Sequence, residues 1–443
     1  MKRKKTLFWM LGILVLAVVA LVVVSNQSPK AADTEETVSV KLGSENLTAF
    51  TVGDLSFEKT ESGWQYAQDP VFPLDQDKAQ AMADVLENLT ADKVIGAPDQ
   101  DKSYGLDAPL CTVTFEGKTL RIGSDAAMDA GRYFSLGDGK VYIAYTDILS
   151  PFRYELLDLA RLDQAPMMEN LTQVTLERQE QAPLVLKDRQ SEGLSYSEDY
   201  IWFYEDTPLD TENTEALIRK GTDTVWSGCA DYNAADLSAY GFDTPTLRLT
   251  VQYGEGKTYT LEVGSAVSGS YYAHMNDSGV VYWMDAADVN ALLEADPKEL
   301  YPNEVLLMDW DTVSAVTVNL ADEHWTFTSA QRDKESTEAG ETVEEGEQET
   351  YWLLNGTEVP LGDRLTALTD MAPTASAIDL EPERMAELTV TVSRTGKPDV
   401  AVTFYRYTGS EELVTLNGVS TVLVSRQDTV DLMEGITKIV LGE

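Results

Sequence analysis

Apolar and polar residues alternate along two well-separated stretches of the chain, residues 111–115 and 247–253. Alternation with a period of two buries one face of a strand and leaves the other in water, which is typical of an antiparallel sheet covered on one side. Elsewhere the apolar spacing is helical, as at Met82, Leu86 and Leu89. The pattern therefore predicts an α+β fold of small antiparallel sheets with flanking helices.

The alternating stretches belong to a longer segment that occurs twice. "YGLDAPLCTVTFEGKTLRIGS" at 104–124 returns as "YGFDTPTLRLTVQYGEGKTYTLEVGS" at 240–265. Further along, "GRYF" from Gly131 matches "GSYY" from Gly269. Self-similarity of this kind indicates tandem copies of one supersecondary unit. Shared flanking features extend both copies, namely Trp64 and Trp202 upstream, and Val141-Tyr142 and Val281-Tyr282 with a short helical pattern downstream.

A third, degenerate copy follows. Trp352 precedes a helical pattern, strand patterns at 387–405 and 413–424 come next, and a closing helix begins near Gln427. This copy lacks the opening Tyr-Gly-x-Asp-x-Pro sequence, here called the Tyr-Gly motif. It also contains an acidic segment without aromatic residues, which we expect to be a mobile loop. The expected organisation is repeat 1 at 46–165, repeat 2 at 166–300 and degenerate repeat 3 at 301–443, with the acidic loop at 331–350.

The chain begins with a basic cluster and an uncharged apolar run from Leu7 to Val24. Eighteen helical residues rise about 27 Å, close to the thickness of a hydrocarbon core. A cleavable signal peptide is the competing interpretation, but its apolar region is usually shorter and ends at a small-residue site. We expect residues 1–25 to contain an uncleaved, single-pass transmembrane anchor and 26–45 to be a tether. The rest should lie on the extracytoplasmic side of the membrane, because basic flanks stay in the cytoplasm.

The Tyr-Gly motif of the first two copies is expected to be structural. Glycine accepts backbone angles closed to other residues, aspartate accepts local N–H groups in turns, proline suits the first residue of an edge strand, and tyrosine packs over the turn. A ligand site in each copy is the functional alternative. The residues concerned are Tyr104, Gly105, Asp107, Pro109, Tyr240, Gly241, Asp243 and Pro245.

The segment "YGEGKTYT" from Tyr253 resembles the end of a phosphate-binding loop. Such a loop needs an earlier glycine and joins a buried strand to a helix. Val251 occupies the glycine position, and alternating strands flank the segment on both sides. We therefore expect a hairpin turn and no nucleotide site.

Few residues suggest catalysis. The chain has two histidines, His274 and His324, without the spacing of a zinc site, and no serine-nucleophile elbow. Its carboxylates are too numerous for a glycosidase-like pair to be located. Cys111 and Cys229 make no disulfide framework, and whether they pair stays open. We expect no catalytic residue, cofactor or metal; an extracytoplasmic hydrolase of a cell-wall polymer or peptide is the alternative.

Charge and aromatic residues bear on partners. The net charge is −42 although a basic cluster opens the chain, so the remainder repels nucleic acid and anionic headgroups. One aromatic group, Tyr271, Tyr272, Tyr282 and Trp283, is a candidate contact for a partner protein. Because adjacent strand residues face opposite sides, about half of this group is expected in the core.

The apolar anchor, the "YGLD-P" sequence, the "GKT" turn and the "VY" strand together resemble domain-of-unknown-function family 4340 (DUF4340). The resemblance rests on 104–124 with Val141-Tyr142 and on 240–265 with Val281-Tyr282. It brings no catalytic residues. It implies an envelope accessory role in bacteria, at the cytoplasmic membrane beside ABC-type transporters related to gliding-motility systems. The sequence thus predicts a membrane-anchored, non-enzymatic binding or scaffolding protein, with an ABC transporter permease or other envelope proteins as partners.

Overall fold

The structure is a computed structural model that describes residues 39–99, 102–126, 131–190, 192, 195, 197–276, 278–333 and 348–443. The predicted anchor at 1–25, most of the predicted tether and residues 334–347 of the acidic loop lie outside the described residues. Within the described ranges, no helix has the length and apolar character needed to cross a membrane. The chain divides between Arg161 and Leu162 into two compact units.

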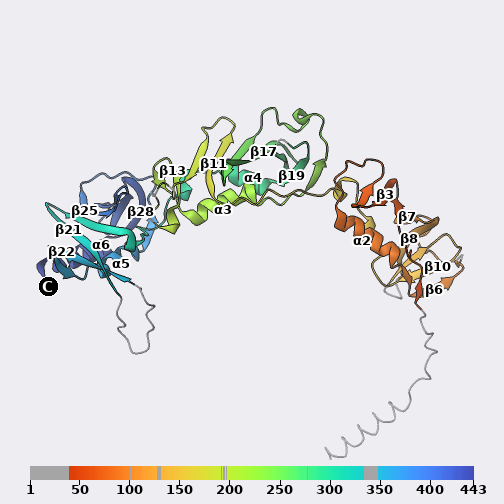
Figure 1. Cartoon of the computed structure of the whole chain (residues 1–443), viewed down its shortest axis with the longest axis horizontal. Coiled ribbons are helices and arrows are strands. Elements are labelled where there is room, and N and C mark those ends of the chain that lie inside the picture. Colours follow the sequence, from red (N-terminus) through yellow and green to blue (C-terminus); the bar gives the residue numbers. More distant parts are fainter. Residues whose placement is uncertain are drawn as a thin grey trace, which may run out of the picture. The chain divides into compact units, whose positions relative to one another are not determined.

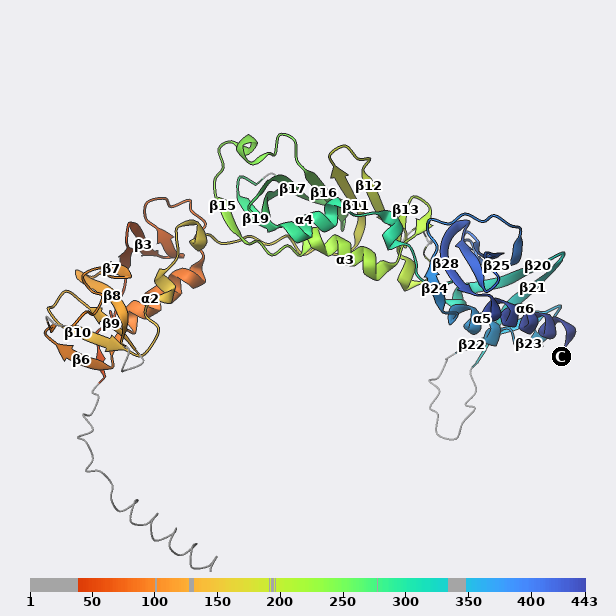
Figure 2. The same ribbon diagram turned by 180° about the vertical axis from the view of Figure 1, so that it is seen from behind.

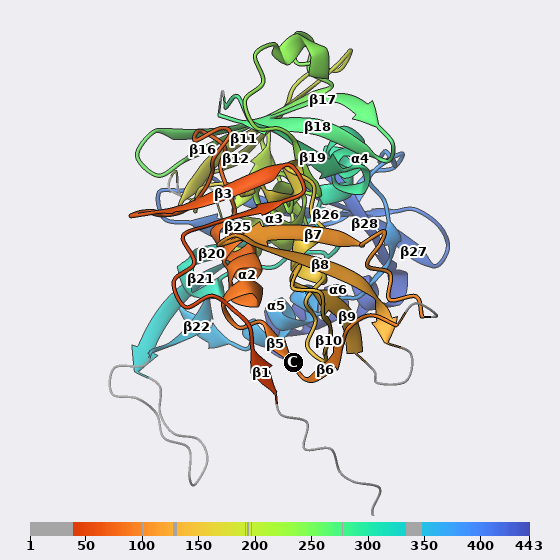
Figure 3. The same ribbon diagram turned by 90° about the vertical axis from the view of Figure 1, so that its right-hand side faces the viewer.

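The first unit contains an eight-stranded antiparallel sheet with helix α2 (Gln76–Glu87) packed on it, and Figure 3 looks onto its strands β7 to β10 in their order. Asp75 caps α2 by accepting the backbone N–H groups of Asp77 and Lys78. A two-stranded sheet pairs β1 (Val40–Lys41) with β5 (Thr90–Ala91). The strand order is β4 (Gly63–Tyr66), β3 (Leu55–Thr60), β2 (Ala49–Val52), β7 (Cys111–Phe115), β8 (Lys118–Ala126), β9 (Gly131–Ser135), β10 (Val141–Ala144) and β6 (Lys93–Gly96).

The second unit holds repeats 2 and 3. Repeat 2 has a nine-stranded sheet with α3 (Thr211–Thr222) and α4 (Ala286–Leu293), and Figure 2 shows its strands in sequence from β15 to β12. The order is β14 (Thr207–Pro208), β13 (Trp202–Tyr204), β12 (Leu184–Asp188), β11 (Leu171–Arg178), β16 (Leu247–Tyr253), β17 (Lys257–Val267), β18 (Ser270–Met275), β19 (Val281–Asp285) and β15 (Gly228–Asp231).

Repeat 3 has a second nine-stranded sheet with α5 (Gly362–Thr369) and α6 (Arg426–Leu441), which lie side by side (Figure 1). The order is β23 (Thr357–Val359), β22 (Gln348–Leu354), β21 (Glu323–Asp333), β20 (Val313–Leu320), β25 (Ala386–Arg394), β26 (Val400–Arg406), β27 (Glu411–Leu416), β28 (Val419–Ser425) and β24 (Pro373–Ser376). The copy that has lost its Tyr-Gly motif therefore keeps the whole strand order.

All three sheets share one topology: a meander, a helix, a strand that crosses to the far edge, and a second meander beside the first. The pairing between strands is antiparallel throughout the described sheets. The predicted α+β fold with antiparallel sheets is thus confirmed. The predicted hairpin is also confirmed, because β16 pairs with β17 from Tyr253↔Lys257 onward and the turn glycines Gly254 and Gly256 have positive φ.

The core of repeat 2 lies between one sheet face and the helices α3 and α4. Leu249 and Leu261 alternate with exposed or half-buried neighbours on β16 and β17, and their side chains are fully buried. Helix α3 approaches the sheet at Gly221, where an added Cβ would lie 2.2 Å from Leu249 Cδ2. The Tyr259 hydroxyl donates to the Gly221 carbonyl at 3.2 Å. An alanine at position 221 would therefore require the buried Leu249 side chain to move.

The strand registers of repeats 1 and 2 correct one sequence match by a residue. Ile122 pairs with Phe134, and Val263 pairs with Ala273. Phe134 is therefore equivalent to Ala273. The sequence match aligns Gly131 with Gly269, which would instead make Phe134 equivalent to Tyr272. The length of the hairpin that joins β8 to β9, or β17 to β18, decides which residues are equivalent. The short sequence motif does not specify this length.

Two further expectations were wrong in detail. Pro109 and Pro245 do not begin edge strands: each lies two residues before β7 or β16, which are interior strands. The closing helix of repeat 1 is only a 3-10 turn at Ser150–Phe152, whereas repeat 2 has the two-turn α4. Asp285 caps α4 through the Ala287 N–H, while Pro151 in the first copy can donate no backbone hydrogen bond.

Candidate functional site

The Tyr-Gly motif packs on a β-bulge in both copies, an arrangement here called the bulge lock. The sheet register shifts within the second strand of each hairpin, between Ile122 and Asp125 in β8 and between Val263 and Ala266 in β17. A glycine at each shift lies against the motif: a Cβ on Gly123 or on Gly264 would be 2.2 Å from the carbonyl oxygen of the motif's tyrosine. The bulge lock thus depends on direct backbone approach.

Residues of the Tyr-Gly motif complete the bulge lock from the other side. Gly105 and Gly241 have φ of +70° and +89°, which favours glycine. Tyr104 and Tyr240 each stack edge-on against a tyrosine of the second meander, with ring centroids 5.0 Å apart. In repeat 2, Tyr240 also donates to Asp231 at 2.8 Å, and this hydrogen bond raises the pKa of Tyr240 to about 12. The remaining motif residues are less enclosed: Asp107 and Asp243 are exposed, and Pro109 and Pro245 are half-buried.

Repeat 3 has lost the bulge lock as a whole. Phe404 is equivalent to Val263, so Tyr405 occupies the position of Gly264. Strands β26 and β27 pair without a shift there. A small apolar cluster replaces the motif, with Ala377, Leu413 and Leu423 buried against Tyr405. The motif, the bulge and the bulge glycine are therefore present together in repeats 1 and 2 and lost together in repeat 3.

The predicted aromatic group divides between the two faces of repeat 2. Tyr282 is buried in the core, stacked on Trp226 with centroids 4.5 Å apart, and burial raises its pKa to about 12. Tyr271 and Tyr272 are half-buried. Trp283 is 37% exposed and lies over Gly228. Within this group, Trp283 offers the most open surface for a partner.

The two histidines and the two cysteines differ in their surroundings. His274 is buried under Phe242 and bonds to Glu262 at 2.8 Å, in a row with Arg248 across three neighbouring strands. His324 is exposed on β21. Both cysteines are free thiols, and burial raises the pKa of Cys229 to about 11.

Repeats 2 and 3 are joined by Tyr200, which sequence reasoning missed. It belongs to the chain before β13, yet its ring is fully buried in the core of repeat 3 with Val305 and Leu306. Its hydroxyl donates to Glu304 at 2.7 Å and accepts the Leu307 N–H at 3.2 Å. Burial raises the pKa of Glu304. No sequence pattern marks a tyrosine that packs into the neighbouring repeat.

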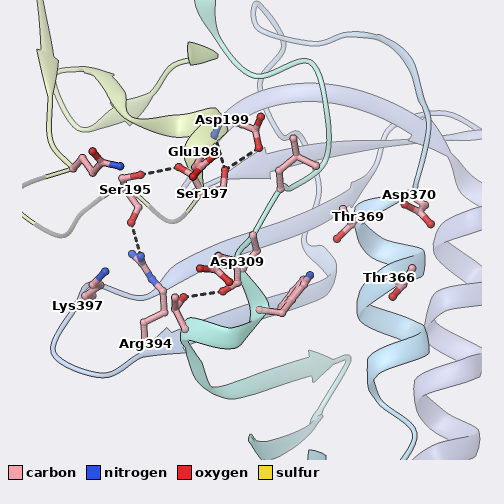
Figure 4. A pocket seen from close by; sticks show the side chains of 15 residues that line it. Ser195, Ser197, Glu198, Asp199, Asp309, Thr366, Thr369, Asp370, Arg394 and Lys397 are labelled. Carbon is pink, nitrogen blue, oxygen red and sulfur yellow. Dashed lines mark hydrogen bonds between the residues drawn. The ribbon is translucent and has the colours of Figure 1, made fainter. Parts of the chain in front are cut away.

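A hollow of about 730 Å³, here called the junction hollow, is lined by residues of both repeats (Figure 4). Repeat 2 supplies one rim through Gln190, Ser195 and residues 197–199. Repeat 3 supplies the turn after β25 and one face of α5. The lining residues are Gln190, Ser195, Ser197, Glu198, Asp199, Leu307, Met308, Asp309, Trp310, Thr312, Thr366, Thr369, Asp370, Arg394 and Lys397.

Arg394 ties the two rims of the junction hollow together. The residue is 96% buried, and its guanidinium donates to the Ser195 carbonyl at 2.7 Å (Figure 4). Ser195 in turn donates to the Ser197 carbonyl at 2.8 Å. Carboxylates such as Asp370 and the ammonium of Lys397 also line the hollow, so its wall carries both signs of charge. Such a mixed polar wall suits hydrogen bonding to a polypeptide surface.

The described residues contain no group of three or more His, Cys, Asp or Glu side chains placed to hold a metal ion.

Comparison with known proteins identifies the family. The family described as Domain of unknown function (DUF4340) matches residues 64–198 and 202–358, more than half of the chain. The chain belongs to this family. No curated protein and no solved structure matches it. The two DUF4340 matches fall on repeats 1 and 2 and extend to β23 of repeat 3, so the family covers the copies that carry the bulge lock.

Proposed function

We propose that this DUF4340 protein is a non-enzymatic binding or scaffolding component held at the outer side of a bacterial cytoplasmic membrane, accessory to an ABC-type transporter or another envelope assembly. The apolar run at 7–24 supports the anchor, and the strongly acidic remainder supports an exported, well-solvated chain.

The observation that carries the proposal is the structural role of the residues that repeats 1 and 2 share. The residues shared by repeats 1 and 2 form the bulge lock, and the hydrogen bond between His274 and Glu262 connects neighbouring strands of the sheet. A composite surface at the junction of repeats 2 and 3 stays accessible; residues of both repeats line it, and Tyr200 and Arg394 connect the two repeats. Tandem units that present such surfaces are typical of binding proteins.

The test is site-specific photo-crosslinking in intact cells. A benzophenone amino acid replaces Thr366, which is exposed in the junction hollow, and Asp428 on α6 provides an exposed control position outside it. Expected adducts from position 366 contain an ABC permease or another envelope protein, identified by mass spectrometry, and are weak or absent from position 428. Equal labelling from both positions, or none from 366, would contradict the proposal.

Enzymatic activity is tested separately. The detergent-solubilised full chain is incubated with purified cell wall and with wall-derived peptides. The binding proposal expects no released fragments; release that persists after size-exclusion purification would replace it with the hydrolase hypothesis.

A further inference from the structure

A second hollow, of about 680 Å³, lies wholly within the second unit, beside helix α3 of repeat 2, and is here called the Trp202 hollow. Its volume is in the range of small-ligand sites. The segment 164–171 forms one wall, and β12, β13 and helix α3 form the other. The lining residues are Gln164, Ala165, Pro166, Met167, Met168, Asn170, Leu171, Asp188, Ile201, Trp202, Glu215, Ile218, Arg219, Thr222, Asp223 and Thr224.

Two buried polar atoms in this lining have no hydrogen-bond partner among the described residues: Trp202 Nε1 and Thr224 Oγ1. Trp202 is 2% exposed and Thr224 is 6% exposed. A buried donor without an acceptor costs free energy comparable to a lost hydrogen bond, so such groups call for an explanation.

In repeat 1 the indole N–H of the equivalent tryptophan has a hydrogen-bond acceptor within the protein. Trp64 is equivalent to Trp202, because both stand near the start of the third meander strand and pair with β3 or β12 at the same register. Trp64 Nε1 donates to Gln80 Oε1 of α2 at 3.1 Å. Gln80 also donates to Asp84 one turn further along the helix, at 2.8 Å.

In repeat 2 the matching helix position carries a different group. Counted from the capping aspartates Asp75 and Asp210, Gln80 corresponds to Glu215, and Arg219 follows Glu215 by one turn. Glu215 bonds to Arg219 at 3.4 Å, so its carboxylate is engaged along the helix. Trp202 lines a hollow whose lining also contains the Glu215 carboxylate, and its buried indole N–H lacks the amide acceptor that Gln80 provides in repeat 1.

The remaining lining indicates what would fit. Met167 is 87% exposed and, with Met168 and Ile218, offers a flexible apolar wall. The lining also contains three carboxylates and one cation, so the charge balance of the hollow is negative; these residues are Asp188, Glu215, Asp223 and Arg219. An occupant therefore needs an apolar side chain, a positive charge and a hydrogen-bond acceptor.

We propose that the Trp202 hollow binds a short peptide segment that joins an apolar side chain to a basic one, with a peptide carbonyl accepting from Trp202 Nε1 and the basic group beside Glu215. This site is separate from the junction hollow and goes beyond the proposed scaffolding role. Trp202, as the buried donor, sets where the peptide backbone lies; Glu215 supplies selectivity for positive charge.

The experiment uses the detergent-solubilised full chain and three capped peptides, acetyl-Leu-Lys-Leu-amide, its Gln analogue and its Glu analogue. Isothermal titration calorimetry is expected to give saturable binding of the Lys peptide, at least tenfold weaker binding of the Glu peptide, and intermediate binding of the Gln peptide. In ¹H–¹⁵N spectra, the indole signal assigned by Trp202→Phe is expected to shift on addition of the Lys peptide.

Matched variants distinguish this site from general attraction to an acidic surface. Trp202→Phe removes the donor and keeps an aromatic ring, and should weaken the Lys peptide about fivefold, as for one lost hydrogen bond. Glu215→Gln should reduce the preference for Lys over Gln. The controls are Trp64→Phe, which removes the equivalent donor in repeat 1, and Glu212→Gln, an exposed residue of α3 outside the lining; neither should change binding.

Three outcomes would overturn the proposal. The first is no saturable heat with about 5 mM Lys peptide, a concentration that detects even millimolar affinity. The second is binding that Trp202→Phe and Trp64→Phe weaken equally. The third is loss of the Lys preference in Glu212→Gln as much as in Glu215→Gln, which would assign binding to the acidic surface as a whole.

Discussion

The bulge lock makes a sharp prediction at Gly264. An alanine Cβ there would lie 2.2 Å from the Tyr240 carbonyl oxygen and 3.1 Å from Phe242 Cε1. Cβ contacts in folded proteins are longer than about 3 Å, so the Tyr-Gly motif must retreat by roughly 1 Å from the bulge. The backbone of Gly264 does not need positive φ, so the steric contact alone is tested.

The free-energy cost of Gly264→Ala comes from the contacts that the displaced Tyr-Gly motif would lose. Overpacking of a close contact costs about 1–3 kcal/mol. Loss of the Tyr240–Asp231 hydrogen bond, whose acceptor is charged, adds about 1–2 kcal/mol. We expect Gly264→Ala to lower the free energy of unfolding of the second unit by about 2–4 kcal/mol, and its Tm by about 3–7 °C.

Differential scanning calorimetry of the detergent-solubilised full chain measures this effect, and hydrogen exchange at 237–246 reports release of the Tyr-Gly motif. Gly279→Ala is the matched control, because the nearest atom to its added Cβ is the Ala234 carbonyl oxygen at 3.9 Å. Gly123→Ala should reproduce the loss in the first unit, where the distance to the Tyr104 carbonyl is also 2.2 Å. If Gly264→Ala unfolds within about 1 °C of Gly279→Ala, the close-approach explanation is wrong.

Three other predictions follow from buried groups. Tyr200→Phe removes the hydroxyl that donates to Glu304 and should destabilise the second unit by about 1–3 kcal/mol in chemical denaturation, with an unchanged result contradicting its role at the junction. Because burial raises the pKa of Cys229 to about 11, its thiol stays protonated at neutral pH and iodoacetamide should label it only at the rate of unfolding, which mass spectrometry checks against a denatured sample. Glu412 is fully buried against Arg426, and burial raises the pKa of its carboxyl group. The folded state therefore favours the protonated form. The resulting stabilisation is present below the unfolded pKa of about 4.3 and is lost as pH rises through the higher folded pKa. Denaturation of Glu412→Gln from acidic to neutral pH should therefore show stability falling less with pH than in the parent, and parallel curves would refute the assignment.

Much of the site could not be anticipated, and the reason is the range of the interactions. Tyr200 sits in a short helical turn before β13, and nothing near it in sequence signals that its ring enters the core of repeat 3, where its hydroxyl bonds to Glu304. The Trp202 indole N–H has no partner whereas that of Trp64 donates to Gln80, and this difference depends on which side chain the neighbouring helix brings to each ring. The sequence did mark both tryptophans as recurring positions, but recurrence alone could not tell a satisfied donor from an open one.

The sequence by itself determined the elements that depend on neighbours along the chain. Alternation at 111–115 and 247–253 predicts half-buried strands, glycines in "GEGKT" predict a hairpin, and the Tyr-Gly motif predicts a repeat, because these preferences act over a few residues. Tertiary structure alone decided which carbonyl meets Gly264, how the equivalent strands align, and where hollows open between helix and sheet. Those outcomes depend on the packing of segments distant in sequence, for which residue patterns carry no distance information.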